Sequence, residues 1–348
     1  MSSSAAAAPD GGLDRKLETA RLAACRLAFG VTACFALVEA LDWDTTFVAP
    51  LLAATMLVKM PRAPSLSQGL GFIVLIVLST GAVMAVTTAL ISHAAALILA
   101  LALLIFLSFY AHRRGAPELA TLLLQISAVA LPVIAVLSPV GAGAFAATLV
   151  LAGIAAIITV WMSHAAFPAP VSDADAMPVI SNNPPAEPAS AARNALLDTA
   201  VLLPVLAWFI LDATQVAIVV LITIVTLLRF PRPQQGQRAA IGLILGNLVG
   251  GLAAAVVYNL MLLGDTLLFF TIALLAASLM FAGRIVTAGA RAPVYAVAFS
   301  TFILLLGLGL SPLPGGSGEA FAARLLNVLL ASAYTIGALS LVQNWRSN

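Results

Sequence analysis

The sequence predicts an all-α integral membrane protein, and three observations support this. Of the 348 residues, 62% are apolar and only 9% are charged, whereas about 25% of the residues in soluble globular proteins are charged. The mean hydropathy is +1.10. Long apolar segments recur along the whole chain between short polar connections. So few charges could not cover the surface of a soluble fold, which excludes nucleic-acid binding and most soluble enzymes.

Twelve apolar segments are separated by charged residues or by Pro and Gly, six in each half of the chain. We expect residues 1–23 to form a cytoplasmic tail and an interfacial helix, and 24–166 to form a first membrane repeat. A linker rich in Pro, Ser and Asp follows over 167–193, and a second membrane repeat covers 194–348. No basic n-region of a signal peptide precedes the first apolar helix, so we expect it to be retained. The predicted spans are 24–41, 46–58, 69–91, 94–111, 119–137, 142–163, 195–211, 216–228, 239–263, 266–283, 292–310 and 322–343.

The basic residues predict an orientation. With a cytoplasmic N-terminus, the twelve alternating spans place every Lys and Arg except Arg324 on the inner side. Such an asymmetry is typical of the positive-inside rule. We therefore expect a multi-pass protein of a bacterial inner membrane, with both termini and the linker in the cytoplasm.

The two halves are related by an internal duplication. An offset of 170 residues brings Leu41-Asp42 onto Leu211-Asp212, Lys59 onto Arg229, and Pro61-Arg62 onto Pro231-Arg232. At a slightly larger offset, Leu137-Ser138-Pro139 falls on Leu310-Ser311-Pro312. Because six is an even number, two six-helix repeats would lie parallel, related by a pseudo-two-fold axis along the membrane normal.

The second segment of each repeat is too short to cross a bilayer as a helix. Residues 46–58 and 216–228 would each give ~20 Å of helix, against a hydrocarbon core of ~30 Å. Pro50 also removes one backbone hydrogen bond from the first of them. Paired short segments at equivalent positions of two repeats indicate a transport path. The alternative is a tilted helix bundle without a path.

Several short motifs surround the short segments in both halves of the chain. They are Leu41-Asp42-Trp43-Asp44, Met60-Pro61-Arg62, Phe230-Pro231-Arg232, Gln237-Arg238, Gly242 and Gly246. By these motifs the chain resembles the fusaric acid resistance protein, or aromatic acid exporter, superfamily. The likeness covers both repeats and is closest to the small two-repeat branch described as a domain of unknown function, with a more distant similarity to plant aluminium-activated malate channels. Two departures stand out: Gln68 replaces the basic residue found at Arg238, and the large cytosolic domains of full-size exporters have no counterpart.

The expected function is efflux of small organic anions driven by the proton-motive force. The aromatic character of the substrate and a periplasmic adaptor as partner follow from the resemblance alone. One alternative is a passive anion channel, and another is a non-transporting membrane subunit that anchors an adaptor complex. No catalytic constellation, Walker motif or metal-ligand spacing occurs in the sequence, so we expect no enzyme activity, cofactor or metal.

The candidate substrate-binding residues are basic side chains at the inner ends of the short segments. A guanidinium presents a planar fork of donors that suits a carboxylate, and clustered charge in a low-dielectric vestibule concentrates anions. These residues could instead be topological anchors or lipid-headgroup contacts. An amide near mid-membrane completes the set, although such amides often only bridge helices. The set is Lys59, Arg62, Arg229, Arg232, Arg238 and Asn247.

Proton coupling is assigned to the repeat-related acids Asp42 and Asp212, with Glu39 one helical turn below Asp42. A carboxylate that is partly desolvated beside another acid has a raised pKa and can exchange protons near neutrality. The alternative is an acid of the outer loop or a cap of the next helix.

Overall fold

The computed structural model describes residues 10–43, 46–168, 186–212, 218–229, 237–261, 263–264, 266–310, 326–335 and 337–338. These residues form helices and their connections, and no strand occurs among them, which confirms the all-α class. The helices are α1 (Asp10–Ala40), α2 (Val48–Lys59), α3 (Leu66–Leu90), α4 (Ala94–Arg113), α5 (Glu118–Leu137), α6 (Pro139–Ala166), α7 (Pro188–Leu211), α8 (Ile218–Arg229), α9 (Gln237–Met261), α10 (Leu267–Thr287), the 3₁₀ turn η1 (Gly289–Arg291) and α11 (Ala292–Leu310).

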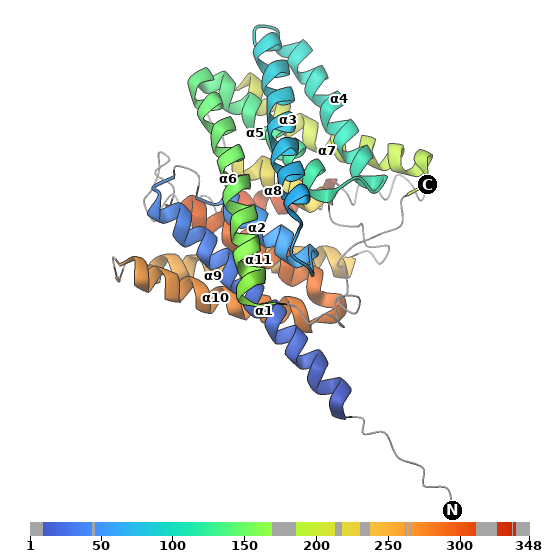
Figure 1. Ribbon diagram of the computed structural model, residues 1–348. Helices are drawn as coiled ribbons and strands as arrows, with labels where there is room; N and C mark the ends of the chain where they lie inside the picture. The colour runs from blue at the N-terminus through green and yellow to red at the C-terminus, as the bar shows by residue number, and fades with distance from the viewer. Residues whose placement is uncertain are drawn as a thin grey trace, which may run out of the picture.

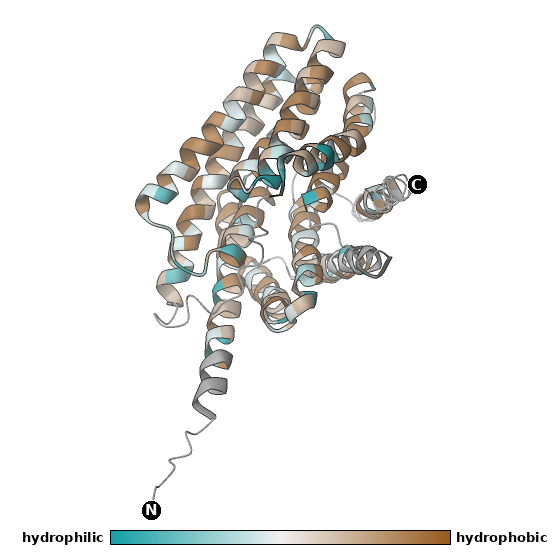
Figure 2. Ribbon diagram, turned by 90° about the vertical axis from the view of Figure 1, so that its right-hand side faces the viewer, coloured by the Kyte–Doolittle hydropathy of each residue, from teal (hydrophilic) through white to brown (hydrophobic). Residues whose placement is uncertain are grey.

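Eight helical stretches within the described residues are long and apolar enough to cross a membrane. Four shorter apolar helices accompany them: Val48–Lys59, Val220–Arg229, Leu245–Met261 and Leu326–Thr335. Figure 2 shows the apolar colouring along the long helices, with polar residues near helix ends and connections. The chain is therefore a multi-pass membrane protein by length and composition.

Local sequence signals explain where several helices begin. Ser65 and Gln68 form a capping box at the start of α3, in which each side chain accepts a hydrogen bond from the other residue's backbone N–H. Ser138 caps α6 and is followed by Pro139, whose missing N–H costs nothing in the first turn. Thr266 caps α10 in the same way.

Two boundaries differ from the predicted domain limits. α1 is one continuous helix from Asp10 to Ala40, so the predicted interfacial segment and the first span share a single axis. α7 begins at Pro188, so the last residues of the predicted linker belong to that helix. Linker residues 169–185 lie outside the described part of the chain.

The two short helices lie in the interior of the molecule (Figure 1). Most of α2 is buried, Pro50 included, and it packs against α1 and α6. α8 is likewise buried from Leu221 to Val225 and packs against α5 and α7. The two helices that are too short to cross a bilayer are thus enclosed by other helices. Protein contacts rather than lipid surround them, as backbone that ends at membrane depth requires.

By contrast, α3, α4, α9 and α10 have exposed faces that are apolar. Large aliphatic side chains are exposed along α3 and α4, and similar ones are exposed along α9 and α10. In a soluble protein, patches of this extent would be an aggregation hazard, whereas lipid accommodates them. These faces include Leu70, Leu78, Leu99, Leu103, Val249, Leu252, Val256, Leu268 and Ile272.

Helix contacts recur between the two halves of the chain. α1 packs along α10, and α7 packs along α4. Within each half, α3 packs on α5 and α9 packs on α11. The short helices also cross over, since α2 contacts α11 and α8 contacts α5. Every one of these contacts therefore has a counterpart at the equivalent position of the other half.

The glycines of α9 allow α11 to approach closely. A Cβ atom on Gly246 would lie 2.9 Å from the carbonyl oxygen of Val294, and one on Gly250 would overlap the carbonyl oxygen of Ala298. Gly242 faces Val294 in the same way. These three glycines recur every four residues and form a smooth strip along which the two helices pack.

Candidate functional site

Four helices bring their ends together around one polar cluster. Lys59 is the last residue of α2, Arg229 is the last residue of α8, and Glu118 is the first residue of α5. Within this junction, α4 contributes His112, and the next turns of α5 contribute Thr121 and Gln125. We call these six residues the cationic cluster.

Arg229 is the centre of the cationic cluster. Its Nη1 donates to the Gln125 Oε1 at 2.6 Å and to the Thr121 Oγ1 at 3.1 Å. Its Nη2 donates to the Glu118 carbonyl oxygen at 2.7 Å and lies 3.5 Å from the His112 Nδ1. All four partners are uncharged, so they fix the guanidinium in place without neutralising it.

Glu118 is shared by two cations. Its Oε2 forms an ion pair with the Lys59 Nζ, and its Oε1 lies 3.7 Å from the Arg229 Nη2. Lys59 and Arg229 therefore carry two positive charges against one carboxylate. The cationic cluster has a net charge of about +1 with His112 neutral.

Accessibility differs within the cationic cluster. The Arg229 side chain is 6% exposed, whereas the Lys59 and Glu118 side chains are 24% and 28% exposed. The guanidinium is thus buried, whereas the ion pair of Lys59 and Glu118 is partly accessible to solvent. Unbalanced positive charge in such a partly desolvated cluster attracts anions, and carboxylates are the natural ligands of a guanidinium and an ammonium.

A second ion pair lies beside the cationic cluster. Arg113, at the end of α4, donates from Nη2 to the Asp198 Oδ2 of α7 at 2.7 Å and to the Leu228 carbonyl oxygen of α8 at 3.4 Å. This pair is balanced, so it adds no net charge. It connects α4, α7 and α8 and holds the end of α8 that carries Arg229.

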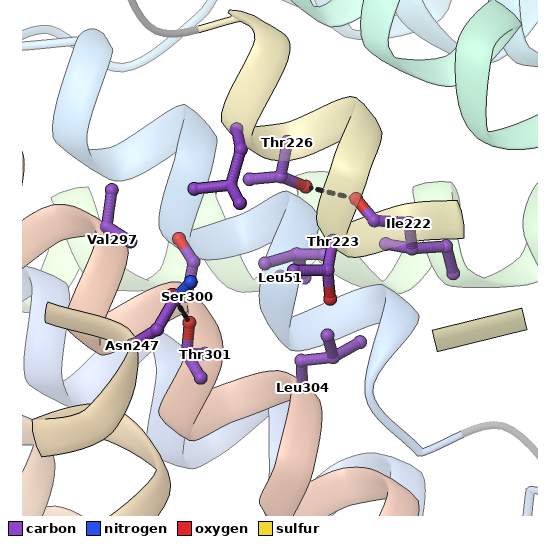
Figure 3. A pocket seen from close by; sticks show the side chains of 10 residues that line it. Leu51, Ile222, Thr223, Thr226, Asn247, Val297, Ser300, Thr301 and Leu304 are labelled. Carbon is purple, nitrogen blue, oxygen red and sulfur yellow. Dashed lines mark hydrogen bonds between the residues drawn. The ribbon is translucent and has the colours of Figure 1, made fainter. Parts of the chain in front are cut away.

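A small cavity lies between the two short helices and two helices of the second half (Figure 3). Its volume of about 20 Å³ is enough for one water molecule. Leu51 of α2 and Thr223 of α8 face it from the short helices, and α9 and α11 supply most of the rest. The Thr223 hydroxyl is buried and has no hydrogen-bond partner among the residues that the structure describes. The cavity therefore offers a free polar group in a largely apolar space.

Asn247 lines this cavity and also bridges three helices. Its Oδ1 accepts a hydrogen bond from the Thr301 Oγ1 at 2.5 Å, which Figure 3 shows. Its Nδ2 donates to the Ser332 Oγ of the last helical segment at 2.5 Å. The Asn247 amide thus bridges helices, which was the alternative to a binding role. Because it also lines the cavity, its position is compatible with contact to a ligand as well.

The cavity and the cationic cluster are adjacent along α8. Thr226 and Leu227 line the cavity, and Arg229 follows within one helical turn. At ~1.5 Å rise per residue, only about 3–5 Å of helix axis separates these positions. An anion held at Arg229 would therefore be close to the cavity along α8.

Of the predicted basic residues, the structure brings two together. Lys59 and Arg229 meet at Glu118, whereas Arg62 is exposed in the connection between α2 and α3. Arg232 lies outside the described residues, and so does the side chain of Arg238.

The predicted coupling acids lie at helix ends and are exposed in the case of Asp42 and Asp212. The N–H of Asp42 bonds to the Glu39 carbonyl, and the N–H of Trp43 bonds to the Val38 carbonyl. This pair of bonds is a Schellman motif, and Asp42 occupies its left-handed position with φ +52°. Asp42 therefore ends α1 through its backbone, while Asp212 follows the last residue of α7.

Sequence reasoning did not identify two acids that the structure places at or beside the cationic cluster, Glu118 and Asp198. Glu118 follows a short polar connection, and no recognisable motif surrounds it in the sequence. Asp198 was detectable, because a lone carboxylate within an apolar span is a functional or structural signal by default. Within the described residues, no group of three His, Cys, Asp or Glu side chains could hold a metal ion.

Comparison with known proteins gives one partial match. Residues 23–163 match a family described as "Protein of unknown function (DUF2955)". The matched region runs from α1 to α6 and so includes Lys59, His112, Glu118 and Gln125 but not Arg229. No curated protein and no solved structure matches the chain.

Proposed function

We propose that this protein is an efflux transporter of the bacterial inner membrane that exports small organic anions, and that the cationic cluster binds them. The observation that carries the proposal is the meeting of Lys59 and Arg229 on the single carboxylate of Glu118. Two cations at equivalent places of a duplicated sequence thus converge on one carboxylate. A set of topological anchors would have no reason to converge, since each would point towards the membrane surface.

The proposed architecture has twelve transmembrane helices in two parallel six-helix repeats around a pseudo-two-fold axis. Reciprocal helix contacts support it, since α1 with α10 repeats α7 with α4. The four shorter apolar helices supply the spans beyond the eight long ones. With both termini and the linker cytoplasmic, the ends of α2 and α8 that carry Lys59 and Arg229 face the cytoplasm.

The proposed path leads from the cationic cluster into the cavity between α2 and α8. Arg62, Arg232 and Arg238 would add positive charge at the inner mouth, and Asn247 would supply a polar contact inside. The cavity volume of about 20 Å³ is far below that of an organic acid, so transport requires helix movement at this point.

The electrical part of the proton-motive force favours export directly. A membrane potential that is negative inside expels a monoanion with about 2.3 kcal/mol per 100 mV. We assign additional proton exchange to Asp42 and Asp212 with Glu39. The aromatic nature of the substrate and a periplasmic adaptor as partner rest on the resemblance of the sequence to aromatic acid exporters.

A flux experiment tests the function. The purified protein is reconstituted in liposomes loaded with radiolabelled benzoate, and efflux is followed with a potassium diffusion potential, with a pH gradient, or with neither. We expect a pH gradient at zero membrane potential to drive benzoate efflux against its concentration difference. Efflux that follows only the concentration difference and the membrane potential, with no response to the pH gradient, would identify a passive anion channel. No flux for any of a panel of aromatic and aliphatic acids would support a non-transporting anchor subunit.

A further inference from the structure

We infer that Glu118 sets the charge selectivity of the cationic cluster, so that the site accepts monoanions and rejects dianions. This inference rests on the proposed function, because it concerns the same site. The observation behind it is a charge imbalance: two cations face one carboxylate, so one positive charge of the cationic cluster is left uncompensated.

Among the described residues that contact the cluster, the other charged groups leave this imbalance unchanged. Arg113 and Asp198 neutralise each other at 2.7 Å. The Arg229 Nη2 can only donate, so the His112 Nδ1 that faces it at 3.5 Å is the acceptor, and His112 is counted as neutral. The remaining partners of Arg229 are a hydroxyl, an amide and a carbonyl. A bound monocarboxylate would thus bring the cationic cluster to neutrality, whereas a dicarboxylate would leave an uncompensated negative charge.

Glu118 is also free to make room for a ligand. Its backbone carbonyl, not its side chain, forms the short hydrogen bond with Arg229. Its carboxylate is 28% exposed and pairs with the equally accessible Lys59. The carboxylate can therefore rotate towards solvent and share the two cations with an incoming carboxylate, while α5 and the Arg229 guanidinium stay in place.

The sequence duplicates the cations but not the acid. In the register where Leu137-Ser138-Pro139 falls on Leu310-Ser311-Pro312, Glu118 corresponds to Arg291. In the same register, Gln125 corresponds to Ala298, which packs against the glycines of α9. The second half therefore lacks the acid and the amide of the cationic cluster. Among the described residues, the carboxylate that we propose to set charge selectivity exists in one copy.

The test compares benzoate with terephthalate at a pH where terephthalate is a dianion. Binding is measured calorimetrically on the detergent-purified protein, and flux is measured in liposomes. The quantity of interest is the ratio of the two dissociation constants, because differences in ligand size cancel between variants. Four proteins are compared: the wild type, Glu118→Gln, Lys59→Met, and the double variant Lys59→Met/Glu118→Gln.

The expected ratio of the two dissociation constants follows the net charge of the cationic cluster. Glu118→Gln leaves about +2 and should shift the ratio towards terephthalate by at least about tenfold. Lys59→Met leaves about zero and should weaken both ligands. The double variant returns to about +1, so it should bind more weakly but regain the preference for benzoate. Glu187→Gln, which removes an exposed carboxylate at the start of α7, should change nothing.

The outcomes separate the inference from the proposed function. If the wild type neither binds nor transports any organic anion, the proposed function fails. If it transports benzoate and Glu118→Gln keeps the wild-type ratio, the function stands and the selectivity role of Glu118 is refuted. If Glu118→Gln does not fold, the double variant decides, since a preference for terephthalate in it would contradict the charge balance.

Discussion

Arg113 and Asp198 form a buried ion pair of 2.7 Å that joins the fourth helix of the first half to the first helix of the second. The Asp198 side chain has no exposed surface. Because α4 and α7 pack along each other, this pair fixes how the halves meet and where α8 ends. A fully desolvated charge needs its partner, so loss of either member leaves an uncompensated charge inside the protein.

We expect Arg113→Gln or Asp198→Ala to destabilise the folded protein by about 3–5 kcal/mol. Thermal inactivation of the purified protein in detergent measures this as a lowered Tm. The control is Arg114→Gln, because that neighbouring side chain is exposed and donates an exposed hydrogen bond to the backbone carbonyl of Ala186. Equal decreases in Tm for Arg114→Gln and Arg113→Gln would show that the ion pair does not contribute to the stability of the folded protein.

Arg229→Gln should lower kcat/KM for anion transport by about ten- to a hundredfold, since charge-assisted hydrogen bonds contribute about 1.5–3 kcal/mol. Arg229→Lys should recover only part of this loss, because an ammonium cannot replace the fork that contacts Thr121, Gln125 and Glu118 together. Arg193→Gln removes an exposed positive charge on α7 and serves as the control. Transport that survives Arg229→Gln in a correctly inserted protein would reduce the cationic cluster to a structural role.

The close approach of α9 and α11 gives a packing prediction. Gly250→Ala should destabilise the protein by about 1–3 kcal/mol, because its new Cβ overlaps the Ala298 backbone and cannot be accommodated by a side-chain movement. Gly71→Ala in α3 is the matched control, since no atom lies within 4 Å of its Cβ position. In that helix Ala should be neutral or stabilising. A lowered Tm for Gly71→Ala but not for Gly250→Ala would contradict this packing.

The proposed orientation can be tested with cysteines. After replacement of Cys25 and Cys34, Ser92→Cys in the connection between α3 and α4 should react with an impermeant thiol reagent added outside cells. Ser67→Cys, which is equally exposed at the start of α3, should react only after the membrane is permeabilised. The opposite pattern would invert the positive-inside assignment.

Helix existence and bounds were predictable because hydropathy and local capping decide them. Residues 292–310 were predicted and found as α11, and Ser65 and Ser138 begin helices through their own side chains. The partner of Lys59 and Arg229 was not predictable. Glu118 lies far from both in sequence, and only the packing of α5 against α2 and α8 brings the three charges together.

The end of α1 shows a second limit of sequence reasoning. Leu41-Asp42-Trp43 was interpreted as an outer loop with a coupling acid or a cap for the next helix. The structure instead places Asp42 at the left-handed position that glycine usually occupies after a helix. Asp and Asn tolerate this conformation better than other side chains, and no hydropathy pattern marks it.

The last prediction concerns proton coupling by Asp42 and Asp212. Asn adopts a φ near +52° as readily as Asp, so the double change Asp42→Asn/Asp212→Asn should leave the end of α1 and the Tm intact. If the carboxylates exchange protons during transport, the double variant should lose accumulation driven by a pH gradient while keeping efflux driven by a membrane potential. Asp42→Gly/Asp212→Asn should behave alike, because glycine keeps the backbone conformation without a carboxylate. A wild-type response to the pH gradient in both variants would leave Asp42 with its role in ending α1 alone.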